Sequence, residues 1–244
     1  MGRYNFDKIV DRKHTKSLKY DFAVQRGKPA DVLPFWVADM DFEIPSELKQ
    51  VLLDRVNHGI FGYTESDDAY FNVLKEWFAS RFNWNIDKKW LVKTPGVVFA
   101  LSMAVRAFTK EGEGVLINQP VYYPFSMVID DNDRNLINVP LIQGADTYTI
   151  DFEGVERAIV EHNVTLFLLC NPHNPVGRVW TEDELKRLGD ICIKHNVIIV
   201  SDEIHADFVW DGHTHTVFAN LGESYAEHCI VCTAPSKSFN IAGL

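Results

Sequence analysis

The sequence has no long uninterrupted run of apolar residues, few cysteines and no block of basic residues. A membrane-spanning helix needs about 18 consecutive apolar residues, and residues 1–14 lack the apolar core of a secretion signal. The 24 lysines and arginines are scattered and are outnumbered by 34 aspartates and glutamates, whereas binding to nucleic-acid phosphates requires clustered positive charge. We therefore expect a cytoplasmic protein with no membrane segment and no nucleic-acid partner.

Four cysteines are too few for a disulfide scaffold in a chain of 244 residues, so we expect reduced thiols. Cys229 and Cys232 have the spacing of a zinc motif, but they lie in a strand-like run where residues three apart face opposite sides. His213 and His215 could bind a metal only with a third ligand, and a polar loop after the turn at 211–212 is the simpler interpretation. We predict no metal site.

The composition, with 46% hydrophobic residues, is sufficient for a large buried core. From about residue 90 onward, apolar runs alternate with segments of helical period, which is typical of an α/β fold with a mainly parallel sheet and helices on both faces. Thr181 and Glu184 form a capping box before one predicted helix. The predicted strands are Val115–Asn118, Leu136–Pro140, Thr165–Cys170, Val197–Ser201 and Cys229–Thr233, and the predicted helices between them include Gly154–His162 and Thr181–His195.

The first ninety residues follow a different pattern. Helices are predicted over Ser46–His58 and Asp67–Phe82, after an irregular arm with prolines at positions 29, 34 and 45. An arm of this kind suggests a segment that wraps onto a partner surface.

Three predicted strands are followed by polar residues of complementary kinds: an amide at Asn174, a carboxylate at Asp202 and an amine at Lys237. The carboxyl ends of parallel strands meet at one edge of a sheet, where ligands bind. These groups suit a pyridine aldehyde cofactor, because a lysine forms a Schiff base with the aldehyde while an acid keeps the ring nitrogen protonated. Each short motif taken alone is also consistent with an ordinary turn.

Six phrases, in order, resemble the fold type I pyridoxal-phosphate enzymes of the class I/II aminotransferase superfamily, in particular the cystathionine C–S lyase branch. The phrases are PFWVADMDF (34–42), FGYT (61–64), NQPVYYPF (118–125), NPHNPVGRVW (171–180), SDEIHADF (201–208) and APSKSFNIAGL (234–244). The resemblance implies an aspartate aminotransferase-like PLP-dependent transferase fold. Residues 1–50 would form an N-terminal arm and part of a small domain, and residues 51–244 a PLP-binding large domain that is incomplete at its C-terminal end.

Carried over residue by residue, the resemblance implies that Lys237 holds pyridoxal 5'-phosphate as a Schiff base and then moves the substrate's α-proton. Asp202 would pair with the pyridinium nitrogen, Asn174 would hydrogen-bond the phenolic oxygen, and Tyr122 would stack on the ring. His205 stands where the wider superfamily commonly has a tyrosine that binds the same oxygen. A helix cap, a turn residue, a surface aromatic and a packed histidine remain the alternative interpretations of Asp202, Asn174, Tyr122 and His205.

A phosphate group requires free backbone N–H groups, and Gly96, Val97 and Val98 lead directly into an apolar helical run. Ser236, just before the lysine, is a second candidate for binding the phosphate. The resemblance adds Tyr63 from the neighbouring subunit, so the active site would be complete only in a homodimer.

The resemblance implies a β-lyase that cleaves cystathionine or cysteine S-conjugates to a thiol, pyruvate and ammonia. An amino-acid aminotransferase and a catalytically impaired, truncated paralogue that acts as a binding module are the alternatives. The chain ends at Leu244, seven residues after Lys237, whereas family members continue into a C-terminal small domain that supplies the arginine for the substrate carboxylate. We expect this chain alone to bind the cofactor weakly and to turn over little substrate.

Overall fold

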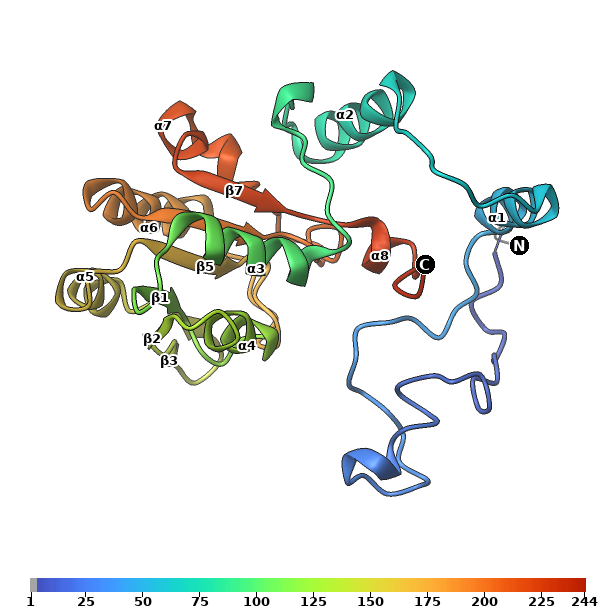
Figure 1. Ribbon diagram of the computed structural model, residues 1–244. Helices are drawn as coiled ribbons and strands as arrows, with labels where there is room; N and C mark the ends of the chain where they lie inside the picture. The colour runs from blue at the N-terminus through green and yellow to red at the C-terminus, as the bar shows by residue number, and fades with distance from the viewer. Residues whose placement is uncertain (1–3) are drawn as a thin grey trace. The chain divides into compact units, whose positions relative to one another are not determined.

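The computed structural model describes residues 4–244, which form two compact units (Figure 1). Unit 1 contains the described residues up to Thr64 together with Pro235–Leu244, and unit 2 contains Glu65–Ala234. Residues 51–64 and 235–244, expected in the larger domain, therefore group with the arm. The assignment of 1–50 and 51–244 to two domains of the family fold stays a prediction, and its first three residues lie outside the described part of the chain.

Unit 2 is built around a five-stranded sheet in which every neighbouring pair is parallel. The predicted apolar runs form these strands, and the expected mainly parallel sheet is confirmed. In spatial order the strands are β2 (Asn135–Asn138), β1 (Gly114–Ile117), β5 (Leu166–Cys170), β6 (Ile198–Asp202) and β7 (Cys229–Cys232).

Helices cover both faces of this sheet, as the alternating pattern predicts. On one face, α3 (Val97–Phe108) and α4 (Pro124–Asp130) contribute to a single buried cluster with side chains from β1, β5 and β6. On the other face, α5 (Phe152–Glu161) and α6 (Glu182–Lys194) do the same. Cys229 packs against the second cluster and Cys232 belongs to the first, which confirms that these two thiols face opposite sides of the sheet.

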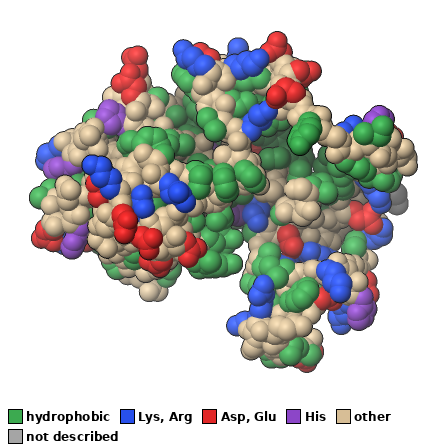
Figure 2. All heavy atoms as spheres, viewed as in Figure 1, with side chains coloured by type: hydrophobic (Ala, Val, Ile, Leu, Met, Phe, Trp, Pro, Cys, Tyr) green, Lys and Arg blue, Asp and Glu red, His purple; other side chains and the backbone are tan. Residues whose placement is uncertain are grey.

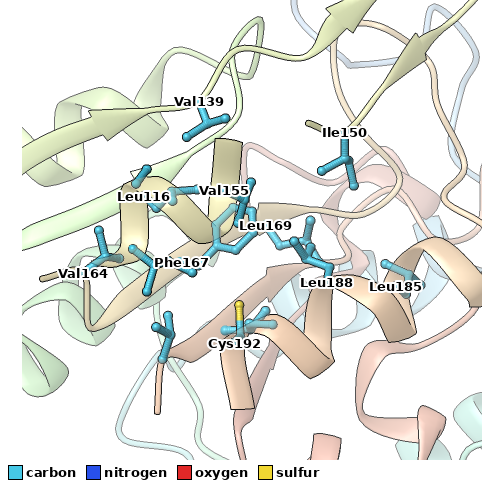
Figure 3. Close-up of a cluster of buried hydrophobic side chains, with 14 of the residues drawn as sticks. Leu116, Val139, Ile150, Val155, Val164, Phe167, Leu169, Leu185, Leu188 and Cys192 are labelled. Atoms are coloured by element: carbon cyan, nitrogen blue, oxygen red, sulfur yellow. The ribbon is translucent and has the colours of Figure 1, made fainter. Parts of the chain in front are cut away.

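The core beneath α5 and α6 consists almost entirely of aliphatic and aromatic side chains (Figure 3). Phe167 and Leu169 alternate along β5 toward this face, whereas Leu166 and Leu168 point to the opposite core. Val155 of α5 and Leu188 of α6 are fully buried against the same face. Continuous burial of β5 on both faces explains why its sequence is an unbroken apolar run.

Local signals determine where several helices begin. The capping box predicted at Thr181 is present, with its hydroxyl accepting from the Glu184 N–H group. Asp67 caps α2 (Asp68–Phe82) in the same way.

The shorter elements were not predicted from sequence: η1 (Val24–Arg26), η2 (Lys88–Trp90), η3 (Phe218–Leu221), α7 (Glu223–Ala226), α8 (Pro235–Ser238), and the antiparallel pair β3 (Ile142–Gln143) and β4 (Tyr148–Thr149).

Unit 1 contains α1 (Ser46–His58), α8 and the irregular arm. Within the described part of the chain, α1 has no buried residue. Figure 2 shows that hydrophobic side chains lie between charged ones on the viewed face of the molecule. The expected wrapping of this arm onto a partner stays a prediction. None of the helices within residues 4–244 has the length and apolar character needed to cross a membrane.

A charged network organises the arm. Arg12 donates to both carboxylate oxygens of Asp39, at 2.8 and 2.9 Å, and to Asp41 at 2.7 Å. The Lys19 ammonium, largely buried, lies 3.0 Å from an Asp39 carboxylate oxygen. Hydrogen bonds from Arg12, partly opposed by burial, hold the pKa of Asp39 below its ordinary value.

Asn240 joins two distant segments of unit 1. Its side-chain oxygen accepts from the Met40 N–H at 3.0 Å, and its amide donates to the carbonyl oxygens of Met40 and Phe42, each at 3.1 Å. The residues that follow α8 are thereby fastened to the arm that carries the Asp39 network.

Burial predicts the cost of truncating valines on α5. Val155 is fully buried and Val160 is 63% exposed, so Val155→Ala should lower the free energy of unfolding by about 2 kcal/mol through lost burial and an added cavity. Val160→Ala, the same change on the same helix, should alter it by less than about 0.5 kcal/mol. Denaturant unfolding followed by circular dichroism measures both. Equal effects would contradict the described packing of α5.

The depressed pKa of Asp39 predicts a pH dependence for the arm. Because folding lowers this pKa from 3.8, the stabilisation is present above about pH 4 and is lost as the pH falls through the folded-state value. Asp39→Asn should destabilise the arm by about 1–2 kcal/mol at pH 7, with a smaller difference in acid. Hydrogen exchange of arm amides between pH 3 and 7 measures this, with exposed Asp31→Asn as the control. A difference that does not shrink in acid would contradict the prediction.

Candidate functional site

The strand order places a topological switch point at the carboxyl edge of the sheet, between β1 and β5. The chain passes from β1 to β2 on one side and later returns to place β5 on the other side of β1. In open parallel sheets, ligands bind outside the carboxyl ends of the strands at such a switch point. The loop after β1 and the loop after β5 flank it, and they are joined directly by a 2.9 Å contact between His173 Nε2 and the Pro120 carbonyl oxygen.

Asp202 is the last residue of β6, two residues after a buried valine on the same face, and is 6% exposed. Its carboxylate accepts from the Ile204 N–H at 3.2 Å, and its carbonyl oxygen accepts from the Asn171 N–H at 2.9 Å. The structure therefore holds a carboxyl group almost out of solvent at the carboxyl edge of the sheet. That placement is compatible with the predicted partner of a cationic ring nitrogen.

The charge of Asp202 affects neighbouring groups from other elements. The pKa of Tyr122 is raised above its ordinary value, mainly by burial and then by the charges of Tyr123 and Asp202. The pKa of the Cys170 thiol is raised by burial and further by Asp202. Tyr122, in the loop after β1, and Asp202, at the end of β6, thus lie close enough to interact electrostatically, although they are 80 positions apart in the sequence.

Asn174 and His205 lie in the loops after β5 and β6, as the sequence predicts. The Asn174 N–H donates to Cys170 Sγ at 3.3 Å, which closes the loop back onto the end of its own strand. The His205 ring packs against Phe208, with ring centroids 6.1 Å apart. Both residues are partly buried, and their predicted contacts with a cofactor stay predictions.

The N-terminus of α3 was predicted to bind a phosphate group, and this role stays a prediction. Gly96 is the N-cap residue of α3 and makes no side-chain capping hydrogen bond, and the first N–H groups of any α-helix have no intrahelical acceptor. A Cβ atom added at Gly96 would meet nothing within 4 Å, which leaves room beside the backbone. Val97 is buried in the same cluster as Cys170 and Cys232, the last residues of β5 and β7, whereas Val98 is exposed.

Three predicted site residues lie in unit 1. Ser236 and Lys237 are on α8 and are partly buried, and Tyr63 is fully exposed after α1. The structure thus gathers Gly96, Tyr122, Asn174, Asp202 and His205 within one compact unit and places these three in the other. The roles of Ser236, Lys237 and Tyr63 stay predictions.

His215 corrects one expectation. The sequence favours a polar loop for His213 and His215, and His213 is indeed exposed, but His215 is 6% exposed and lies 2.9 Å from the buried carboxylate of Glu203. The apolar residues Val217 and Phe218 that follow are buried and draw this part of the loop inward.

Neither Glu203 nor the inward position of His215 was identified from sequence. The sequence does contain a signal for the burial of Glu203. Ser201 and Glu203 alternate with Asp202 at the end of a buried strand, and a buried acid there needs a polar partner. Among residues 4–244, no group of three or more histidine, cysteine, aspartate or glutamate side chains could hold a metal ion.

The sequence is similar to a known family and to characterised proteins. A model of the family described as aminotransferase class I and II matches residues 30–244. Cystathionine beta-lyase PatB of Bacillus subtilis is 45% identical over 240 residues, covering 98% of this chain and 62% of the relative.

Solved structures give the same result. Cystalysin from Treponema denticola, which contains pyridoxal 5'-phosphate, is 42% identical with a TM-score of 0.92, over 98% of this chain and 61% of that protein. The PLP-bound C–S lyase from Staphylococcus hominis is 35% identical with a TM-score of 0.91, over 100% and 62%. The chain described here spans about 62% of the length of PatB. With both the family pattern and the fold matching across most of its length, the chain belongs to the aminotransferase class I and II family.

Proposed function

We propose that this chain is the cofactor-binding part of a pyridoxal-phosphate-dependent carbon–sulfur β-lyase, which cleaves cystathionine or cysteine S-conjugates to a thiol, pyruvate and ammonia. The observation that carries the proposal is the Asp202 carboxylate, held nearly out of solvent at the end of β6 and within electrostatic range of Tyr122. The similarity to cystalysin, which contains pyridoxal 5'-phosphate, supports the cofactor, and the similarity to PatB and to a PLP-bound C–S lyase supports the reaction class.

The donor set of unit 2 fits a flat, phosphorylated pyridine. Asp202 would accept a hydrogen bond from the protonated ring nitrogen, and the Tyr122 ring offers an aromatic surface for stacking. Asn174 and His205 would bind the phenolic oxygen. The uncapped N–H groups of Gly96, Val97 and Val98 would bind the phosphate, and the open space beside Gly96 supports this role.

We further propose that Lys237 supplies the amine that holds the cofactor and then moves the substrate's α-proton, with Ser236 as a second phosphate ligand. When bound, pyridoxal phosphate supplies a ring that accepts electrons from the substrate's α-carbon. Tyr63 would contribute to the site of a neighbouring subunit in a homodimer. Its full exposure in this chain is compatible with that role.

The same residues serve an aminotransferase, and the family description includes that activity. Lyase and aminotransferase differ in what happens after proton removal, because a thiolate on the β-carbon leaves only in the lyase reaction. The names of the similar proteins favour the lyase. This chain covers 62% of the length of PatB. The activity of this chain is therefore proposed and is not taken over from PatB.

Lys237 should be the preferred site of cofactor attachment. The 244-residue chain, incubated with excess pyridoxal phosphate and reduced with borohydride, should carry a pyridoxyl group on Lys237 in peptide mass spectrometry. Borohydride makes the bond permanent, so weak binding is sufficient. Lys237→Ala should lose this label, whereas Lys13→Ala, at an exposed lysine, should retain it. Labelling spread evenly over surface lysines would contradict the proposed role.

Substrate turnover distinguishes the proposed reaction from its alternatives. The 244-residue chain, incubated with cystathionine and excess pyridoxal phosphate, should release pyruvate slowly without any 2-oxo acid acceptor, in keeping with the weak activity expected of this chain. Lys237→Ala should reduce that rate at least a hundredfold because the proton-transferring amine is lost. A coupled assay with lactate dehydrogenase measures pyruvate. Turnover that requires a 2-oxo acid would favour the aminotransferase, and labelling at Lys237 without either reaction would favour an impaired protein.

A further inference from the structure

A second acid is buried beside Asp202, on the opposite face of the sheet. Glu203 is 2% exposed, and its carboxylate accepts from the Ser201 hydroxyl at 2.8 Å and from the Phe218 N–H at 2.9 Å. Its other oxygen lies 2.9 Å from His215 Nε2. The carboxylate therefore has partners on β6 itself and on the segment 215–218.

His215 is equally enclosed. It is 6% exposed, and its ring meets Phe82 edge to face with centroids 5.5 Å apart. Desolvating an acid is costly unless hydrogen bonds and an ionic or polar partner compensate for the lost water. A protein with an apolar pair of similar volume at these positions would often be at least as stable. Added stability therefore does not explain why Glu203 and His215 are buried.

The segment 215–218 is also fastened to the neighbouring strand end. The Asn171 side chain, after β5, donates to the Thr216 carbonyl oxygen at 3.1 Å, while the Asn171 backbone N–H donates to the Asp202 carbonyl oxygen at 2.9 Å. Val217 and Phe218 are buried in the same segment. One buried segment thus holds the carboxyl ends of both β5 and β6.

We propose that Glu203, through His215 and the segment 215–218, is a positioning residue that fixes the direction of the Asp202 carboxylate. This inference rests on the proposed cofactor role of Asp202. Successive side chains of a strand point to opposite faces, so a rotation of the backbone at 202–203 would move both acids together. Anchoring Glu203 on the face of α5 and α6 therefore determines where Asp202 points on the face of α3 and α4.

Two backbone amides report the position of Asp202 without any cofactor. The Ile204 N–H donates to the Asp202 carboxylate, and the Asn171 N–H donates to its carbonyl oxygen. Their hydrogen-exchange rates, divided by that of Leu168 in the middle of β5, separate a local change at the strand ends from a general loss of stability.

The experiment compares Glu203→Gln and Glu203→Leu with Val155→Ala, which destabilises the same core at another place. Gln keeps the size and one acceptor oxygen, so it should fold even if Leu does not. In Glu203→Gln, we expect the exchange ratios of Ile204 and Asn171 to rise at least tenfold, and in Val155→Ala to stay within twofold of wild type. The dissociation constant for pyridoxal phosphate, followed by its absorbance, should rise at least fivefold in Glu203→Gln and stay within twofold in Val155→Ala.

Unchanged exchange ratios in Glu203→Gln would overturn the inference, whatever the stability of the variant. Altered ratios with an unchanged dissociation constant would overturn it as well, because Asp202 would move without consequence for the cofactor. If the wild-type chain binds no pyridoxal phosphate but the ratios still rise in Glu203→Gln, the positioning of Asp202 is supported and the proposed function fails.

Discussion

Cys170 lies opposite Asp202 at the last register position of the β5–β6 pair, and Asp202 lies opposite Cys232 in the β6–β7 pair. This parallel register determines where the polar groups of the candidate site emerge from the sheet. The loops after β5 and β6 both begin at this level, so Asn174 and His205 start from one edge. The strands β5 and β6 are buried on both faces here, and such strands tolerate few polar residues. Asp202, at the end of β6, is therefore largely shielded from water.

Much of the fold follows from the hydrophobic pattern. The five strands of the parallel sheet lie within two residues of the predicted runs, and the capping box correctly marks the start of α6. These features depend on local period and on burial, which the sequence records directly. The short elements, such as α7 and the β3–β4 pair, have no comparable period and were not predicted.

The site was predictable in part, for a different reason. Asp202 and Asn174 follow apolar strands, so parallel topology brings them to one edge. Glu203 and His215 were not identified, because their pairing depends on how a loop folds back twelve positions later along the chain. No local period encodes that return. The roles of Lys237, Ser236 and Tyr63 stay predictions, since these residues lie in the other compact unit.

The binding of Asn240 to Met40 and Phe42 has a consequence for biosynthesis. Asn240 follows Met40 by 200 positions. A ribosome that adds about 5–20 residues per second therefore makes the arm roughly 10–40 s before the side chain that fastens it. During that interval the hydrogen bonds of Asn240 are missing, whereas both partners of the Arg12–Asp39 contact have already been made. The local ion network can thus preorganise the arm during translation, and the lysine-bearing segment completes it last.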